Sequence, residues 1–408
     1  MKEGERMKSV LSVDVAKNKS MFLLMNSDGE ILIDTIEYTH NLSNFNELKE
    51  RINELKLEDL TVFMESTGTY HLPVERFFKT NNFNVIVING LSNKNNFDTI
   101  RKTKTDKQDC IKLAKLFFVA EHKQHNFKQE LNYKNLKLLV RQYFFLIDQN
   151  VNCKNRLKRL INLCFPEYEE IFKNEKIYEE TALNFIQAFP HAYIIKEKRI
   201  DALYNNLYKT NGRHLRAYKS VANKIKDYAN ISYPGVDKDS TDVENLVVIA
   251  KVVQKNQREI ASLKEKMISL AQTSPLFDII SSYYGIGELS ASILLGELGD
   301  ITRFDNEKQL IAFCGLDPTI TQSGKSVNIH GSISKRGDKY VRKILFNICQ
   351  NMVKICSKHF PNHPIYEYYI KKKSEGKHYY ERLTMCSTKL LRTLLAMCKK
   401  NEKFTLSK

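Results

Sequence analysis

Short apolar runs separated by turn residues open the chain. Residues 9–15 (SVLSVDV), 20–25 (SMFLLM) and 31–37 (ILIDTIE) are rich in β-branched and apolar side chains. A turn signal, Ser27-Asp28-Gly29, separates the last two runs. This pattern predicts an antiparallel three-strand start.

Helical and strand patterns then alternate. Apolar positions recur at helical spacing over 42–55, and the apolar runs at 60–64 and 85–88 are typical of buried strands. We expect a helix near 71–80 between these strands, and a second helix opened by Thr105 after them. The order βββαβαβα predicts a mixed α/β sheet, as expected of a ribonuclease H-like (RuvC-like) domain.

Two long heptad patterns follow. Apolar positions step by alternating threes and fours from Leu136 to Ile161 and again from Ile249 to Leu270, about four heptads in each case. A coiled-coil or helical-hairpin stalk is one interpretation, and two amphipathic helices packed within one globular domain is the other. Asn150 and Asn256 occupy inward positions of these heptads, where a polar residue fixes register or oligomeric state.

The remaining segments are mainly helical. Residues 166–240 form a basic helical insert that ends in a loop at 232–241, and the sequence assigns it no role. Farther on, helices are expected at 290–298, 338–357 and 378–398. The stretch TQSGKSVNIHGSISKRGDK between the first two of these is interpreted as a loop rich in Gly, Ser and Lys.

Length and composition support a multidomain globular protein. A chain of 408 residues can form two or three cores, and 42% hydrophobic residues exclude a disordered chain. We predict an α/β domain over 1–125, a helical coiled-coil region over 126–273 that contains the insert, and a mainly α domain over 274–408.

Charge and cysteine usage narrow the class further. The 64 Lys plus Arg against 47 Asp plus Glu leave a net charge of +17, which favours polyanionic partners, although a basic but indifferent surface is the alternative. Eight cysteines without a CxxC pair indicate reduced thiols, and Cys349 and Cys356 fit one helix face as small core residues. No apolar run approaches the roughly 20 residues of a membrane span, and the N-terminus lacks a signal-peptide core, so we expect a cytoplasmic protein without a membrane partner.

The stretch KTDKQDC contains the first candidate chemistry. Asp106 and Asp109 are three residues apart, so both lie on one face of the expected helix. One interpretation is structural, because Thr105 and Gln108 fit a capping box and acidic residues complement the helix dipole. The other is chemical, because neighbouring carboxylates repel unless a cation joins them.

Two further carboxylates favour the chemical interpretation. Asp14 lies in the first strand, and Glu65 closes the strand LTVFM. If these strands are adjacent and the helix from Thr105 packs across them, both converge with Asp106 and Asp109. A pair of divalent cations would neutralise such a cluster, and two metals suit phosphodiester chemistry.

These residues resemble a known family. SVDVAKN with Asp14, MESTGTYH with Glu65, and KTDKQDCIKLAKL are similar to the DEDD-motif, RuvC-like domain of the insertion-sequence 110 family of transposases, which is related to Piv-type DNA invertases. The run from GIGELSASILLGELGDITRF to SKRGDKYVRKIL resembles the second, transposase domain of that family. The two similarities cover roughly 8–120 and 276–350.

The resemblance implies a catalytic mechanism. Asp14, Glu65, Asp106 and Asp109 would be the catalytic tetrad and bind Mg²⁺, with two ions expected and Mn²⁺ as a substitute. A serine followed by glycine would attack DNA and form a phosphoserine link, and it maps to Ser323 in the stretch QSGKS, which by residue type alone is a flexible turn. Rival residues are Ser326, Ser332 and Ser334 for the nucleophile and His330 for a general acid.

Several residues are candidates for nucleic-acid binding. Gly285 and Gly287 precede a helix and could expose amide groups to a phosphate, although a plain tight turn explains them as well. The other candidates are basic: Lys104, Lys107, Lys325, Lys335, Arg336 and Arg342. No base is evident beside Ser323, so we expect the tetrad's metal to activate it when the two domains meet, within one chain or across subunits.

The family also implies partners: donor and target DNA, a structured noncoding guide RNA (bridge RNA), and further copies of the chain as a dimer or a tetramer on DNA. Two features depart from the family pattern, namely Tyr283-Tyr284 before GIG and the insert at 166–240. Competing hypotheses are a RuvC-like nuclease that hydrolyses branched DNA with water, and a non-catalytic scaffold that only binds nucleic acid.

Overall fold

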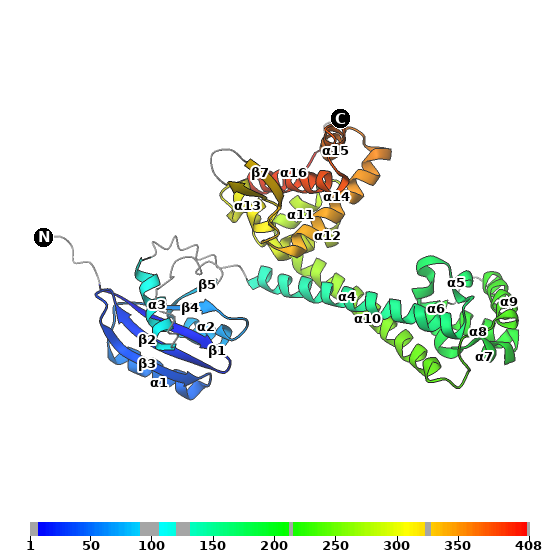
Figure 1. The fold of residues 1–408 in the computed structure, drawn as a ribbon, viewed down its shortest axis with the longest axis horizontal. Helices are drawn as coiled ribbons and strands as arrows, with labels where there is room; N and C mark the ends of the chain where they lie inside the picture. The colour runs from blue at the N-terminus through cyan, green and yellow to red at the C-terminus, as the bar shows by residue number, and fades with distance from the viewer. Residues whose placement is uncertain (1–6, 90–105, 120–130, 212–214, 323–327, 406–408) are drawn as a thin grey trace. The chain divides into compact units, whose positions relative to one another are not determined.

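The computed structural model describes residues 7–89, 106–119, 131–211, 215–322 and 328–405 (Figure 1). The chain divides into two compact units, 1–128 and 129–408. Within the described ranges, no helix combines the length and the apolar character that crossing a membrane requires.

A mixed five-stranded sheet forms the first unit. Its strands are β1 (Lys8–Ala16), β2 (Lys19–Asn26), β3 (Ile31–Thr39), β4 (Asp59–Ser66) and β5 (Asn84–Asn89), in the order β3-β2-β1-β4-β5. The first three strands pair antiparallel, whereas β4 runs parallel to both β1 and β5. Every strand that the hydrophobic pattern predicted in this part is therefore confirmed, and β1 and β4 are adjacent in the sheet.

Helices cover both faces of this sheet. Helices α1 (Leu42–Glu54) and α2 (His71–Thr80) bury Phe45, Leu48 and Phe78 in one hydrophobic cluster with the sheet. Helix α3 (Asp106–Val119) packs on β1, β2 and β4 within a second cluster on the other side. This flanked mixed sheet is consistent with a ribonuclease H-like fold, as predicted.

Two long helices form the axis of the second unit. Helices α4 (Leu131–Cys164) and α10 (Thr241–Ala271) pack along each other as the heptad patterns predicted (Figure 1). Asn150 is 7% exposed at its inward position, and Asn256 is half-buried with Nδ2 4.0 Å from Cys153 Sγ. The side chain of Ser240 caps α10 by accepting a hydrogen bond from the amide of Asp242 at 3.2 Å.

The insert is helical, as expected. Its elements are α5 (Tyr168–Ile171), η2 (Asn174–Tyr178), α6 (Glu180–Ala188), α7 (Ala192–Glu197), α8 (Ile200–Asn211) and α9 (Leu215–Ile231). Tyr168 and Phe185 are completely buried in a cluster that also contains Leu157 of α4 and Leu246 of α10. The insert therefore shares one core with the adjoining ends of the two long helices.

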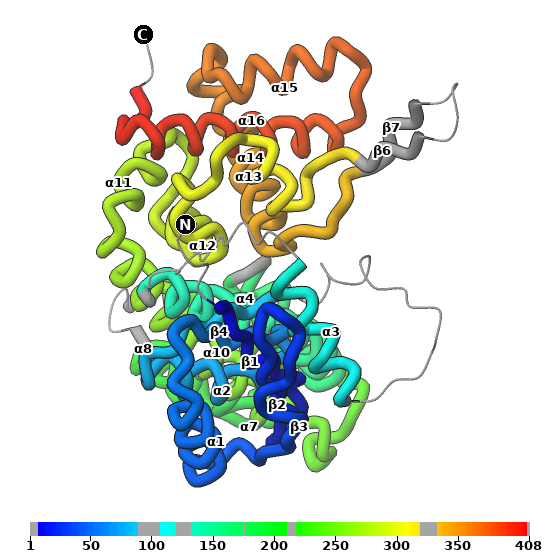
Figure 2. Tube along the Cα trace, turned by 90° about the vertical axis from the view of Figure 1, so that its left-hand side faces the viewer, coloured from blue at the N-terminus to red at the C-terminus, as the bar shows by residue number. Residues whose placement is uncertain are grey.

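The C-terminal segment packs around the opposite ends of these helices. It contains α11 (Leu276–Ser281), α12 (Glu288–Leu298), η3 (Ile301–Arg303), α13 (Glu307–Cys314), β6 (Pro318–Gln322), β7 (Asn328–Ile333), α14 (Lys339–His359), α15 (Pro364–Ser374) and α16 (Tyr379–Lys400). Helices α14, α15 and α16 pack on one another (Figure 2). The hydrophobic core of this segment includes Leu136 and Val140 of α4. Cys349 and Cys386 are buried in the same cluster.

One prediction for this segment was wrong. The stretch interpreted as a loop begins at Thr321 and contains the end of β6 and all of β7, and the pairing of these strands runs from Pro318 with Ile333 to Gln322 with Asn328. The Gly and Ser residues conceal a short β pattern, because these strands are only 5 and 6 residues long and contain few apolar side chains. The hairpin β6–β7 is thus a defined element that encloses 323–327.

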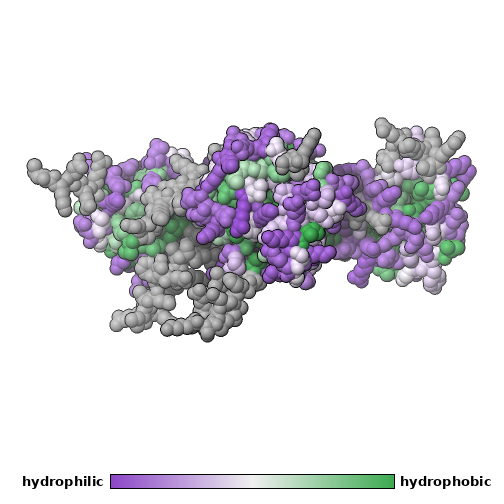
Figure 3. All heavy atoms as spheres, turned by 90° about the horizontal axis from the view of Figure 1, so that it is seen from above, coloured by the Kyte–Doolittle hydropathy of each residue, from purple (hydrophilic) through white to green (hydrophobic). Residues whose placement is uncertain are grey.

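Hydrophilic side chains cover much of the surface in view in Figure 3, with smaller hydrophobic areas between them. This is the usual surface of a globular chain, and buried apolar clusters account for most of the large hydrophobic residues. All eight cysteines are free of disulfide bonds.

Candidate nucleic-acid-processing site

The alternation of side chains along β1 places Asp14 on the sheet face that α3 covers. Leu11, Val13 and Val15 belong to the cluster under α1 and α2, so Asp14 points the opposite way. Its register partner on β2, Met21, packs in the cluster with α3. Asp14 is therefore a partly buried carboxylate beneath or beside α3.

Glu65 lies on the same face of the neighbouring strand. Its register partner on β5, Ile88, packs in the cluster with α3. The parallel pairing of β1 and β4 ends with Val13 opposite Met64, so Asp14 and Glu65 are the next residues on two adjacent strands. Adjacent strands are about 4.8 Å apart, which brings the two carboxylates close together at the sheet centre.

Helix α3 supplies the third and fourth predicted carboxylates. Cys110 Sγ lies 3.5 Å from the carbonyl oxygen of Met21, so the start of α3 lies over the strand position next to Asp14. Asp109 is half-buried, and its Oδ1 lies 3.3 Å from Lys112 Nζ. Asp106 is the first residue of α3, and its side chain lies outside the described residues, as does the predicted cap Thr105.

The donor chemistry of this face fits a hard divalent cation. Asp14 and Glu65 offer carboxylate oxygens, which Mg²⁺ prefers, and Asp109 lies on the helix that covers them. Among the side chains that the structure describes, no three such ligands are grouped closely enough to form a metal site. The structure therefore places Asp14 and Glu65 on one sheet face and Asp109 on the helix that covers this face, without defining a metal geometry.

Lys107 contacts the protein itself. Its Nζ lies 2.7 Å from Asp34 Oδ1 on β3, and this hydrogen-bonded lysine lowers the pKa of the Asp34 carboxyl. Both side chains are at least half-exposed. Lys104, the other basic candidate of this region, lies outside the described residues.

The predicted nucleophile falls within the hairpin β6–β7. Ser323 and Lys325 lie between Gln322 and Asn328, which form the last paired positions of the two strands, and both are outside the described residues. The structure does describe the base of the hairpin, which consists of the residues on either side of 323–327.

Two glycines allow the chain to cross itself at the hairpin base. Gly315 ends α13 with φ +63, and a Cβ atom there would lie 2.5 Å from the amide nitrogen of Gly337. A Cβ atom on Gly337 would overlap the carbonyl oxygen of Phe313. Real Cβ atoms do not approach backbone atoms this closely, so both positions require glycine.

The basic residues of this base have different surroundings. Arg342 Nη1 donates hydrogen bonds to the carbonyl oxygens of Cys314 at 2.9 Å and Gly337 at 2.8 Å. Arg342 therefore links the segment that ends α13 to the segment that contains Gly337. Lys335 and Arg336, by contrast, are exposed, and their contact with nucleic acid stays a prediction.

The structure explains Gly285 by packing. It has φ +92, and a Cβ atom there would overlap Met352 Cγ. Gly287 is the N-cap of α12, with no atom within 4 Å of an added Cβ, but Glu288 places an acidic residue in the first turn. Acidic charge there opposes phosphate binding, so the observed geometry is that of a tight turn, and a phosphate contact stays a prediction.

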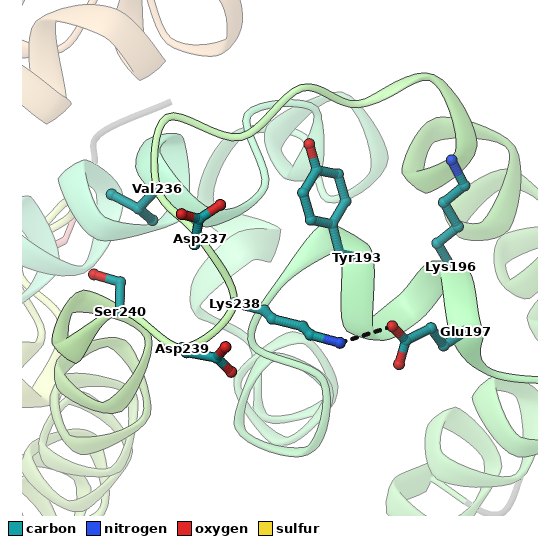
Figure 4. Close-up of a pocket in the computed structure, with 8 residues that line it drawn as sticks. All are labelled: Tyr193, Lys196, Glu197, Val236, Asp237, Lys238, Asp239 and Ser240. Carbon is teal, nitrogen blue, oxygen red and sulfur yellow. Dashed lines mark hydrogen bonds and ion pairs between the residues drawn. The ribbon is translucent and has the colours of Figure 1, made fainter.

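The insert contains an open cavity of about 950 Å³ between α7 and the start of α10 (Figure 4). Lys196, Lys238, Glu197, Asp237 and Asp239 line it, and Lys238 Nζ pairs with Glu197 Oε1 at 2.9 Å. Charges of both signs leave no clear preference for an anion or a cation.

Sequence reasoning missed the residues that support the hairpin, including Asp317, Asp338 and Glu297. Ser334 Oγ donates to Asp317 Oδ1 at 2.7 Å, and Asp338 caps α14 by accepting from the amides of Tyr340 and Val341 at 2.8 and 3.1 Å. An aspartate directly before an amphipathic helix is a capping signal, so the role of Asp338 was open to prediction. Glu297 gave no such signal, because it lies within an otherwise apolar run.

Two family models match separate parts of the chain. A model of the DEDD transposase domain of IS110 elements, described as "Transposase", matches residues 11–166, which include Asp14, Glu65, Asp106 and Asp109. A second model, described as "Transposase IS116/IS110/IS902 family", matches residues 278–364, which include Ser323. The two matches define the class as transposase, and the chain belongs to the IS110 family.

Curated relatives are similar over shorter segments. A probable family 20 transposase of Pseudomonas aeruginosa is 30% identical over 105 residues, 26% of this chain and 31% of that protein. An IS110 insertion-element protein of Streptomyces coelicolor is 29% identical over 121 residues, 29% of each chain. The transposase for insertion sequence element IS1111A of Coxiella burnetii is 33% identical over 88 residues, 22% of this chain and 24% of that protein. The chain thus spans less than a third of each relative's length.

Proposed function

We propose that the protein is a metal-dependent DNA transposase that cuts and rejoins DNA through a phosphoserine intermediate. The observation that carries this proposal is that Asp14 and Glu65 each directly follow the last paired residues of two adjacent strands, on the face that α3 covers. Family membership supports the reaction class, and Ser323 lies in the segment that matches the second transposase model.

The two carboxylates and those of α3 would hold Mg²⁺, two ions in our proposal, with Mn²⁺ as a substitute. Bound there, the metal supplies positive charge beside the reacting phosphate and lowers the pKa of an attacking hydroxyl. Asp14 and Glu65 are suited to this because strand pairing fixes each of them on one side, Asp14 opposite Met21 of β2 and Glu65 opposite Ile88 of β5. A rigid sheet positions ligands better than a loop does.

The chemistry at Ser323 consists of two transesterifications. In the first, Ser323 Oγ loses its proton and attacks phosphorus, an Oγ–P bond forms, and the P–O bond to one deoxyribose breaks as that oxygen gains a proton. In the second, a hydroxyl of another DNA end attacks the phosphoserine and releases Ser323. The exposed Lys335 and Arg336 at the hairpin base would stabilise negative charge on the phosphate or hold the DNA backbone.

The partners in this proposal are donor and target DNA, a structured guide RNA, and further copies of the chain. A net charge of +17 supports polyanion binding by counterion release. Base pairing by the RNA would then choose the DNA sequence, while the protein contacts shape and backbone.

The test is recovery of a covalent protein–DNA adduct from cells that contain the mobile element and express the protein. Ser323→Ala should abolish the adduct, whereas the matched control Ser326→Ala should retain it. Asp14→Asn and Glu65→Gln should also lose it, because they remove metal ligands without removing the nucleophile. Metal-dependent DNA cleavage by Ser323→Ala would instead favour a nuclease that uses water, and an adduct that persists in this variant would overturn the assignment of Ser323.

A further inference from the structure

Glu297 is a buried carboxylate outside the proposed metal site. It lies in α12, which is buried along most of its length, and Glu297 is 1% exposed. An uncompensated charge at such a position is strongly destabilising. The side chains that contact Glu297 must therefore compensate its charge.

Helix α4 supplies these partners. Arg141 Nε lies 3.3 Å from Glu297 Oε1, and Arg141 Nη2 lies 3.2 Å from Oε2, so the guanidinium binds the carboxylate with both arms. Lys137, one turn earlier on α4, lies 3.5 Å from the same Oε2. The fork geometry of arginine suits this bidentate contact.

The same guanidinium reaches the hairpin base. Arg141 Nη2 also lies 3.4 Å from Asp338 Oδ2, and its charge lies over the ring of Tyr340 at 5.5 Å from the ring centroid. Asp338 caps α14, and its own amide donates to the carbonyl oxygen of Phe313 at 3.0 Å. Arg141 thus joins α4, α12 and the start of α14 at one point.

Backbone hydrogen bonds continue this connection into the hairpin. The amide of Ser334 donates to the carbonyl oxygen of Asp317 at 2.8 Å, and that of Lys335 to Gly315 at 3.1 Å. Gly315 and Gly337 approach each other so closely that neither has room for a Cβ atom, so these two segments are packed directly against each other. A displacement of Asp338 would therefore move the base of β6–β7.

We infer that Arg141 and Glu297 are positioning residues, which with Asp338 form a carboxylate clamp that fixes the base of the β6–β7 hairpin and so determines where Ser323 is held. This inference rests on the proposed function in one respect, namely that Ser323 is the nucleophile. The clamp itself depends only on described contacts. It assigns the N-terminal part of α4 a role in aligning the reacting segment as well as in packing.

The test compares Arg141→Ala and Arg141→Lys in the full chain with a matched control, Arg258→Ala. Arg258 lies on α10 and pairs with Glu180 at 2.7 Å in an exposed ion pair, so its loss removes a charge and an ion pair elsewhere in the unit. Lysine at 141 keeps the charge but cannot contact two carboxylates in fork geometry. Three quantities are measured: melting temperature, amide hydrogen exchange of 334–338, and the rate of adduct formation.

Both Arg141 variants should exchange the amides of 334–338 faster, and Arg141→Lys should do so with a wild-type melting temperature. Adduct formation should slow by about 100-fold, the size expected when a reacting group is misplaced by about 1 Å. Arg258→Ala should match wild type in exchange and adduct rate.

Wild-type exchange and adduct rates in Arg141→Lys and Arg141→Ala would overturn the clamp. If wild-type protein forms no Ser323 adduct, the proposed function fails, and exchange at 334–338 still decides whether the clamp exists. Faster exchange with an unchanged adduct rate would refute the positioning role.

Discussion

Replacing Glu297 by glutamine should change how stability depends on pH. Burial raises the pKa of the Glu297 carboxyl to about 6 from an ordinary 4.5, aided by Asp338 and opposed by Arg141 and Lys137. Glutamine keeps the shape of the side chain but has no carboxyl proton to lose, so it stays neutral at every pH. The variant therefore isolates the cost of ionising this carboxylate in the folded protein.

The sign follows from proton linkage. Because the folded pKa lies above the unfolded value, the folded state binds more protons between these values, and stability falls as pH rises from about 4.5 to about 6. The difference between the folded and unfolded pKa values corresponds to about 2 kcal/mol of folding stability. About 1 kcal/mol of this stability is lost between pH 5 and pH 8. The Glu297→Gln variant should not lose this stability between pH 5 and pH 8.

Urea unfolding followed by far-ultraviolet circular dichroism measures the effect. The free energy of unfolding of wild type minus that of Glu297→Gln should fall by about 1 kcal/mol from pH 5 to pH 8, at an unchanged slope against urea. The control is Glu307→Gln, since Glu307 pairs with Arg392 in a half-exposed ion pair and should show little such change. A difference that instead rises with pH would mean that Arg141 outweighs burial and would refute the reasoning.

Three further substitutions test the packing that the structure assigns. Gly285→Ala should destabilise the fold by about 3 kcal/mol, because it combines a positive φ with overlap onto Met352, whereas Gly287→Ala should be nearly neutral in thermal melts. Loss of DNA affinity in both variants without loss of stability would restore the phosphate-binding interpretation. Tyr168→Phe should cost about 1 kcal/mol in urea unfolding, since its buried hydroxyl donates to the carbonyl oxygen of Ala182 at 2.6 Å, and an unchanged midpoint would contradict this.

Local pattern determined most of the secondary structure. Short apolar runs marked β1 to β5, and the two heptad patterns marked α4 and α10, because strands and helices bury apolar side chains at different spacings. The same rule explains why Asp14 could be proposed as a site residue. A carboxylate between Val13 and Val15 points away from the apolar face that they form.

The hairpin β6–β7 was missed because its strands depend on partners far along the chain. Ser334 is hydrogen-bonded to Asp317, and the crossing of Gly315 with Gly337 joins residues more than twenty positions apart. Neither contact leaves a periodic signal. The stretch therefore had the composition of a loop and the structure of a sheet.

The sequence by itself predicted strands β1 to β5, the two long helices and the basic charge, and it contains the segments that match the family. Only the tertiary structure decided which basic side chains bond to groups of the protein and which are exposed to solvent. Arg342 and the half-exposed Arg141 bond to groups of the protein, whereas Lys335 and Arg336 are exposed. The physical reason is that the cost of burying a charge depends on partners that folding brings together, and no local pattern encodes those partners.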